Sequence, residues 1–312
     1  MPLEPRLRPI LALENRRVVD DATFAARRLA STIQARQLGR LVMQHGPKVP
    51  TREVMVPVHG GAIRVRLYEP AGVGLRPLHV FLHGGGWCVG DLDQRDPRCR
   101  SIAVGAGCVV ASVDYRMAPE NAYPTPLEDC YAALCWLVAH AEEQGLDATR
   151  VSVGGESAGA NLAAVVALLA RDRNGPSLVF QWLDVPATDL TLSQPSIDRL
   201  GTGYGLTKVD MEEYLAAYLR DVDPADRYVS PLHYQDLSGL PPALVMTAEF
   251  DPLRDDGHAY VTRLREAGVE VEHHHLDGFV HAAFAFTRLL PTARQYEATA
   301  IAALRRAYVG SS

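Results

Sequence analysis

Residues 151–159 have the sequence Val-Ser-Val-Gly-Gly-Glu-Ser-Ala-Gly, and the stretch at 160–170 that follows is rich in alanine and leucine. The apolar, β-branched run before the glycines predicts a strand, the glycines predict a sharp turn, and the alanine-rich stretch predicts a helix. Gly155 and Gly159 stand two positions before and after Ser157, so the strand and helix backbones can pass closely at the turn. A serine on such a turn is a candidate nucleophile.

This strand and helix belong to a longer alternation along the chain. Residues 54–58 and 63–68 are predicted to be the two strands of an antiparallel hairpin that turns at 59–61. Further strands are predicted at 77–82, 109–114, 147–153, 180–185, 243–248 and 269–276, and helices at 94–106, 127–144 and 259–267. Strands that alternate with helices predict a mostly parallel sheet covered on both faces. In such a sheet, functional sites form at the C-terminal ends of the strands.

A second glycine-rich stretch, His83-Gly84-Gly85-Gly86-Trp87, directly follows the strand predicted at 77–82. Consecutive glycines after a strand leave backbone N–H groups free to point at one spot, where they can stabilise a developing oxyanion. A flexible turn and a phosphate-binding loop are the simpler alternatives. A phosphate-binding loop would end in Lys-Ser or Lys-Thr, whereas Trp87-Cys88 stands here. We therefore expect an oxyanion-binding loop, completed by the amide of Ala158 after the candidate nucleophile.

A serine hydroxyl needs a base within hydrogen-bond reach, and the base needs a carboxylate that orients it. Asp251 follows the strand at 243–248, where it can also act as the N-cap of the next helix with Pro252 at its first position. His281 comes after the last strand and a glycine turn at Gly278. Ser157, Asp251 and His281 are therefore the candidate triad, in the chain order expected of an α/β-hydrolase.

Two other patterns are weaker indications of a bound ligand. The triplet at 273–275 contains three histidines, but adjacent strand residues point to opposite faces and no further spaced ligands follow. The sequence Gly-Thr-Gly-Tyr-Gly at 201–205 neither follows a strand nor has the glycine spacing of a dinucleotide fingerprint. We therefore expect no metal at the histidine triplet and no dinucleotide at 201–205.

The chain is expected to contain one catalytic domain at 51–312 and a helical cap. Residues 1–50 have helical spacing, for example over 16–44, and form the N-terminal part of the predicted cap. The alternation of strands and helices stops at about 187–232, and we interpret this stretch as an insertion that completes the cap over the strand ends.

Composition limits the partners and the compartment. The 312 residues have a formal net charge of −6 and no long run of one charge sign, so neither nucleic acid nor an anionic membrane is an expected partner. Prolines and charges interrupt the N-terminal stretch, and no apolar run is long enough to span a bilayer. The odd number of cysteines, without paired spacing, indicates reduced thiols. We expect a cytoplasmic protein that acts on a small molecule, with a homodimer as one candidate assembly.

At these motifs the sequence resembles the hormone-sensitive-lipase-like branch (bacterial family IV) of α/β-hydrolase carboxylesterases. The landmarks that carry the resemblance are the stretches at 83–87, 114–120, 155–159, 230–232, 251–253 and 278–281. The resemblance implies an α/β-hydrolase fold, a helical cap, hydrolysis of esters with short to medium acyl chains, and no cofactor. It implies that Ser157, Asp251 and His281 are catalytic, that Gly85, Gly86 and Ala158 are oxyanion donors, and that His83, Gly84, Trp87 and Glu156 support them.

Two departures from the family pattern affect the expected site. Glu156 stands where the family usually has aspartate, which keeps the charge on a longer side chain. Ala282 and Ala283 follow His281 where the family usually has Gly-Phe, and the loss of this aromatic side chain is expected to widen the pocket. An acyltransferase or an amidase would use the same triad. A binding protein like the plant gibberellin receptors is a further alternative, but those receptors lack the histidine that stands here as His281.

Overall fold

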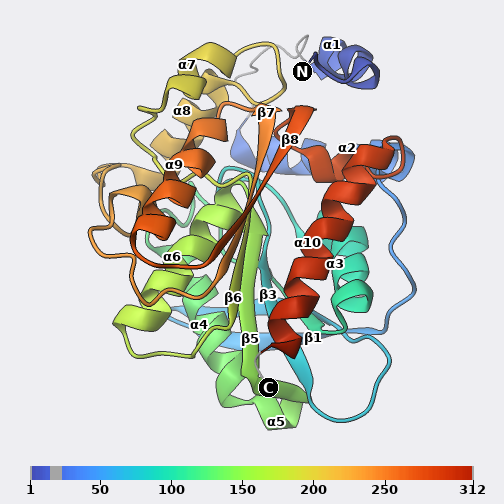
Figure 1. Ribbon diagram of the computed structural model, residues 1–312, viewed down its shortest axis with the longest axis vertical. Helices are drawn as coiled ribbons and strands as arrows, with labels where there is room; N and C mark the ends of the chain where they lie inside the picture. Colours follow the sequence, from blue (N-terminus) through green and yellow to red (C-terminus); the bar gives the residue numbers. More distant parts are fainter. Residues whose placement is uncertain (1, 15–22, 311–312) are drawn as a thin grey trace.

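The computed structural model describes residues 2–14 and 23–310, and its central feature is an eight-stranded sheet (Figure 1). The strands are β1 (Thr51–Val58), β2 (Gly61–Tyr68), β3 (Arg76–Leu82), β4 (Val109–Val113), β5 (Leu146–Glu156), β6 (Phe180–Asp184), β7 (Ala243–Phe250) and β8 (Val271–Val280). Their order is β1-β2-β4-β3-β5-β6-β7-β8, antiparallel through β1, β2 and β4 and parallel from β4 onward. The predicted mostly parallel sheet is confirmed.

Helices cover both faces of the sheet (Figure 1). One face is covered by α4 (Thr125–Ala139), α6 (Ala158–Asp172) and α9 (Arg254–Glu266), and the other by α3 (Leu92–Ala106) and α10 (Pro291–Val309). The strand period of two divides the apolar side chains between two cores. Leu78, Val80 and Leu82 of β3 pack under α4 and α6, whereas Phe81 points to the core beneath α3 and α10.

The remaining elements lie mainly around the C-terminal ends of the parallel strands. They are η1 (Pro5–Leu7), α1 (Arg8–Glu14), α2 (Phe24–Val42), α7 (Pro195–Leu200), α8 (Lys208–Leu219), η2 (Pro231–His233) and η3 (Ala283–Phe286). Arg27 of α2 forms an ion pair with Glu213 of α8 at 2.5 Å, so segments far apart in sequence meet at this end. Residues 16–22 of the helix expected at 16–44 lie outside the described residues.

Several expected elements have other bounds in the structure; the helix expected at 259–267, for example, is α9 and begins at Arg254. The helix expected at 127–144 breaks at His140, whose Nδ1 contacts the carbonyl oxygen of Trp136 at 2.9 Å, and α5 (Ala141–Gln144) follows as a separate turn. Strand β8 does not end at Leu276 but runs to Val280. Gly278, at φ +75°, turns its N–H to the Glu249 carboxylate, and the strand then resumes pairing with β7.

None of the helices formed by residues 2–14 and 23–310 combines the length and the apolar character that crossing a membrane requires.

Candidate active site

The turn between β5 and α6 holds Ser157 in a strained backbone conformation, with φ 54° and ψ −122°. This region of φ is unfavourable for a residue that has a Cβ atom, so the surrounding packing must enforce it. A Cβ atom at Gly155 would lie 2.4 Å from the Leu82 carbonyl oxygen, and one at Gly159 would lie 2.1 Å from the same oxygen. Only glycine at both positions lets β3, β5 and α6 approach closely enough to form the turn.

Ser157, His281 and Asp251 form one hydrogen-bonded chain. The His281 Nε2 atom lies 2.9 Å from the Ser157 hydroxyl oxygen, and His281 Nδ1 lies 2.8 Å from Asp251 Oδ2. Because the buried carboxylate accepts from Nδ1–H, the neutral imidazole keeps its acceptor nitrogen toward Ser157. Burial of the ring opposes protonation, but the charge and hydrogen bond of Asp251 outweigh it and raise the pKa of His281.

The two carboxylate oxygens of Asp251 have different hydrogen-bond partners. Its Oδ1 accepts from the backbone N–H of Leu253 at 2.9 Å, which leaves Oδ2 for His281. Contrary to expectation, Asp251 is therefore not the N-cap of α9. The helix begins at Arg254, and Leu253 occupies the cap position. The short turn at Asp251 places its carboxylate opposite the end of β8.

The glycine loop lies beside Ser157, and two aromatic contacts hold it. The His83 ring stacks on Tyr115 at 4.3 Å, and Trp87 stacks on Tyr218 of α8 at 4.6 Å with an interplanar angle of 3°. A Cβ atom at Gly86, where φ is +59°, would lie 2.3 Å from the Tyr214 ring. Among the described residues, no acceptor is found for the N–H groups of Gly85 and Gly86, and Ala158 begins α6, where N–H groups lack helical partners.

Glu156 lies behind the turn in a buried cluster of charges that sequence reasoning did not find. Its carboxylate accepts from Arg95 and Arg98 of α3, and more weakly from the backbone N–H of Gly84 at 3.4 Å. Burial raises the pKa of Glu156, but the two guanidinium groups outweigh it and lower the pKa. Arg98 also bonds to Asp184 and Glu297. Arg95 and Arg98, one helical turn apart in the helix after the glycine loop, were the sequence feature that could have predicted this cluster.

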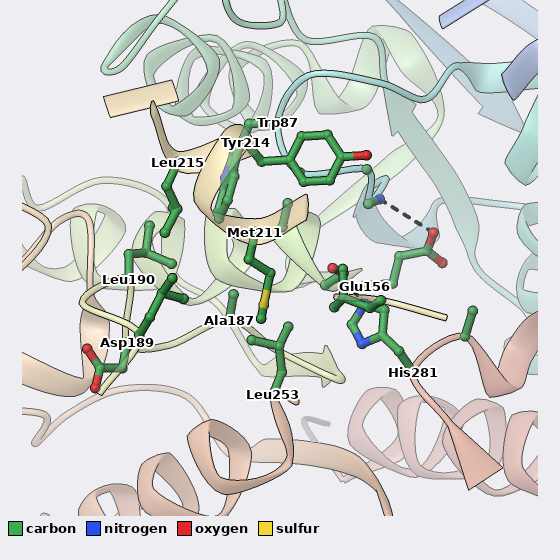
Figure 2. A pocket seen from close by; sticks show the side chains of 18 of the residues that line it. Trp87, Glu156, Ala187, Asp189, Leu190, Met211, Tyr214, Leu215, Leu253 and His281 are labelled. Atoms are coloured by element: carbon green, nitrogen blue, oxygen red, sulfur yellow. Dashed lines mark hydrogen bonds between the residues drawn. The ribbon is translucent and has the colours of Figure 1, made fainter. Parts of the chain in front are cut away.

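A cavity of about 210 Å³ opens at the Ser157–His281 pair (Figure 2). Its walls are mostly apolar and come from the loop after β6, from α8 and from Leu253: Ala187, Leu190, Leu192, Leu206, Met211, Tyr214, Leu215 and Leu253. Gly84, Gly85, Gly86, Trp87, Glu156 and Ala158 also line it.

The expected widening of the pocket at Ala283 is not supported by its position. Ala283 is 1% exposed in the core beneath α3 and α10, whereas Ala282 and Phe284 line the cavity. The 3-10 turn η3 rotates Ala283 inward, and an aromatic side chain one residue later reaches the site instead.

A second serine–histidine pair has a structural role. His79 Nδ1 lies 2.8 Å from the Ser152 hydroxyl, and that hydroxyl also contacts Tyr308 at 2.5 Å. Both residues are fully buried between β3 and β5 and do not line the cavity. Burial lowers the pKa of His79 to about 3, so this ring stays neutral at ordinary pH.

The histidine triplet is arranged as strand geometry predicts. His273 and His275 share one face of β8, where they meet His258 of α9, and all three rings contact the Thr247 hydroxyl within 3.4 Å. Within residues 2–14 and 23–310, no set of three or more His, Cys, Asp or Glu side chains has the geometry of a metal site.

Fold and site together define a class of protein. A mostly parallel sheet that carries a hydrogen-bonded Ser–His–Asp chain at the ends of its strands, in the chain order Ser, Asp, His, is the arrangement of the α/β-hydrolases. A family model described as alpha/beta hydrolase fold matches residues 79–285. The chain belongs to this family, in its hormone-sensitive-lipase-like branch of carboxylesterases.

Individual relatives agree with this membership. The carboxylic ester hydrolase LipN of Mycobacterium tuberculosis is 47% identical over 245 residues, which cover 76% of this chain and 65% of LipN, a little under two thirds of its length. The carboxylesterase NlhH of the same organism is 45% identical over 78% of each chain. A hyperthermophilic esterase from Pyrobaculum calidifontis, 34% identical, superimposes over the full length of both chains with a TM-score of 0.92.

Proposed function

We propose that the protein is a serine carboxylesterase in which Ser157 is the nucleophile, His281 the general base and Asp251 the orienting carboxylate. One observation carries the proposal: the three side chains form a continuous hydrogen-bonded chain of 2.9 and 2.8 Å that ends at the cavity. A serine hydroxyl that donates to a neutral imidazole, itself held by a buried carboxylate, is activated for attack on an acyl carbon.

The reaction proceeds through an acyl-enzyme. Ser157 Oγ attacks the ester carbonyl carbon as its proton passes to His281 Nε2, and the carbonyl oxygen becomes an oxyanion that accepts from the N–H groups of Gly85, Gly86 and Ala158. The C–O bond to the alcohol then breaks, and the alcohol leaves with the proton from His281. A water molecule, deprotonated by His281, attacks the acyl-enzyme and releases the acid and Ser157.

The cavity supports a preference for short to medium acyl chains. Its walls are mostly apolar, and its volume of about 210 Å³ is small. We infer that α2 and the segment at about 187–232 form a cap, since Met211, Tyr214 and Leu215 of α8 supply part of these walls and Arg27 of α2 pairs with Glu213. Residues of this cap would then choose the acyl and alcohol groups.

A reducing, cytoplasmic location is the proposal that best fits the cysteines. None of the five forms a disulfide, and four are buried. Burial raises the pKa of Cys88 and of Cys99 to about 12, so both stay protonated and unreactive at neutral pH.

The test is hydrolysis of p-nitrophenyl esters from acetate to dodecanoate by the wild type and by Ser157→Ala. We expect turnover that peaks at short or medium chains, and a loss in kcat of about four to six orders of magnitude in the variant. Circular dichroism of Ser157→Ala provides the folding control. Retention of most activity by a folded Ser157→Ala protein would refute the mechanism, and transfer of the acyl group to added alcohols in preference to water would indicate a transferase.

A further inference from the structure

Arg95 is a cationic side chain in the wall of an otherwise mostly apolar cavity. Its Nε atom donates to Glu156 Oε1, and the guanidinium carbon lies 5.3 Å from the centre of the Phe284 ring. The first contact holds one edge of the planar guanidinium group and the second holds one face. The orientation of the group is therefore fixed before any ligand arrives, which reduces the entropy lost on binding.

The remaining edge of this guanidinium group is open. Among the described residues, the Nη1 and Nη2 atoms of Arg95 make no hydrogen bond, and they are not enclosed in the core, since the side chain is 19% exposed. Arg98, one helical turn further along α3, uses all three of its nitrogens on Glu156, Asp184 and Glu297. Arg98 is saturated by structural partners, whereas Arg95 keeps donors available at the cavity.

A ligand carboxylate could bind this open edge without breaking the existing pair. Glu156 also accepts from Arg98, so it keeps one cationic partner if Arg95 takes another anion, and Arg98 shares its charge between Glu156, Asp184 and Glu297. Two terminal N–H groups of a guanidinium match the two oxygens of a carboxylate, which gives a charge-assisted and often bidentate contact.

The second acidic side chain of the cavity does not oppose this assignment. Asp189 is held by the hydroxyls of Thr191 and Ser193 and by His233. In Figure 2, Asp189 and Leu190 lie at one end of the cavity, and Glu156 and His281 lie at the other. Arg95 pairs with Glu156, so its guanidinium group belongs to the end of the cavity that also contains His281, and Asp189 is at the opposite end.

We propose that Arg95 forms a carboxylate-binding subsite and that the preferred substrates are esters with a free carboxylate on one half and an apolar group on the other. The proposal rests on the esterase function proposed above and specifies its substrate class. Monoesters of short dicarboxylic acids and carboxylated aryl esters both have this chemistry, and they differ in whether the anion is on the acyl or the alcohol half.

The experiment compares kcat/KM for two matched pairs of esters. Mono-p-nitrophenyl glutarate is paired with p-nitrophenyl valerate for the acyl half, and 4-carboxyphenyl butyrate is paired with phenyl butyrate for the alcohol half. The variants are Arg95→Gln, which keeps an N–H donor for Glu156 but removes the charge, and Arg100→Gln as the matched control. Arg100 is on the same helix but pairs with Asp96 and the Val49 carbonyl, away from the cavity.

In at least one pair, we expect Arg95→Gln to lower kcat/KM of the anionic ester about tenfold or more, because a charge-assisted contact is lost. The neutral ester should change less than about threefold. Arg100→Gln should leave both esters near wild type. Raising NaCl from about 0.05 to 0.5 M should reduce the relative rate on the anionic ester in the wild type but not in Arg95→Gln.

Equal losses on anionic and neutral esters would overturn the proposal, because Arg95 would then act only by holding Glu156. Unchanged ratios in both pairs would overturn it as well. Calorimetric titration of monoethyl glutarate into Ser157→Ala and into Ser157→Ala/Arg95→Gln measures binding at the subsite in the absence of hydrolysis. Loss of binding in the double variant supports the subsite even if no ester is hydrolysed, and equal binding refutes it. If Arg95→Gln does not fold, Arg95→Met replaces it, since methionine also removes the charge and the same outcomes apply.

Discussion

At the scale of single residues, the proposed mechanism assigns the pH dependence of the reaction to His281. Its pKa is raised above the ordinary value of about 6.5 because Asp251 favours the imidazolium form. A protonated ring cannot accept the proton of Ser157, so kcat/KM should fall as the pH drops through a value above about 6.5. The pH–rate profile measures this acid limb, and Asp251→Asn should move it to lower pH. A limb centred below pH 6 in the wild type would contradict the assignment.

The His281–Asp251 pair also contributes to folding stability, and this contribution decreases with rising pH, whereas kcat/KM increases. A histidine whose pKa is raised by folding stabilises the native state below its unfolded pKa, and this contribution disappears as the pH rises through the folded pKa. The proposed mechanism therefore uses the neutral form of His281, in which this stabilising charge pair is absent.

The two alanines after His281 should respond differently to the same substitution. Ala283→Phe places a ring into a filled core and should cost about 1 to 3 kcal/mol of unfolding free energy. Ala282→Phe adds a ring to the cavity wall and should shift the preferred acyl chain to shorter lengths. Thermal unfolding and the p-nitrophenyl ester series measure the two effects. A shortened chain preference in Ala283→Phe at an unchanged Tm would show that residue 283 reaches the cavity after all.

At the scale of elements, Arg98 joins α3 to the ends of β5 and β6 and to α10. Its guanidinium group contacts the carboxylates of Glu156, Asp184 and Glu297 and stacks over Phe284 at 4.3 Å. These bonds hold the turn that carries Ser157 and the segment after His281 against one buried group.

Arg98→Met should therefore destabilise the protein by about 3 to 5 kcal/mol, because it leaves buried carboxylates without a cation. The cost should be smaller at pH 5 than at pH 8, since burial raises the pKa of Glu297 to about 7 and this side chain is neutral in acid. Urea denaturation at both pH values measures the difference. Arg100→Met, which breaks a half-exposed pair on the same helix, is the control and should cost less than about 1 kcal/mol. Equal losses in the two variants would exclude a special role for the buried cluster.

At the scale of the whole molecule, Arg28 connects α2 to the loop after the glycines and to the loop after β4. It donates to the carbonyl oxygens of Cys88 and Ala118 at 2.6 and 2.5 Å and pairs with Glu120. Arg28→Ala should release α2, because charge-assisted hydrogen bonds contribute about 1.5 to 3 kcal/mol each. We expect a lower Tm and faster proteolysis within 23–43, with Arg173→Ala, an exposed pair with Glu128, as the control. Proteolysis at the wild-type rate would show that other contacts hold α2.

The sequence by itself determined the strand, turn and helix around Ser157, the glycine loop at 83–87 and the mostly parallel sheet. These features depend on local physics: the steric freedom of glycine, the alternation of apolar side chains in strands, and the rule that parallel strands end at one edge. Ser157, Asp251 and His281 each follow a predicted strand, which was sufficient to expect that the three would meet at this edge.

Only the tertiary structure decided which distant side chains surround them. The pairing of Glu156 with Arg95 and Arg98, the burial of Ala283 instead of Ala282, and the open edge of Arg95 each depend on how α3, η3 and β5 pack in three dimensions. Residues 58 to 199 positions apart share the Arg98 cluster, and no local periodicity relates them. Packing between elements, rather than propensity within them, decides which charged side chains surround Ser157.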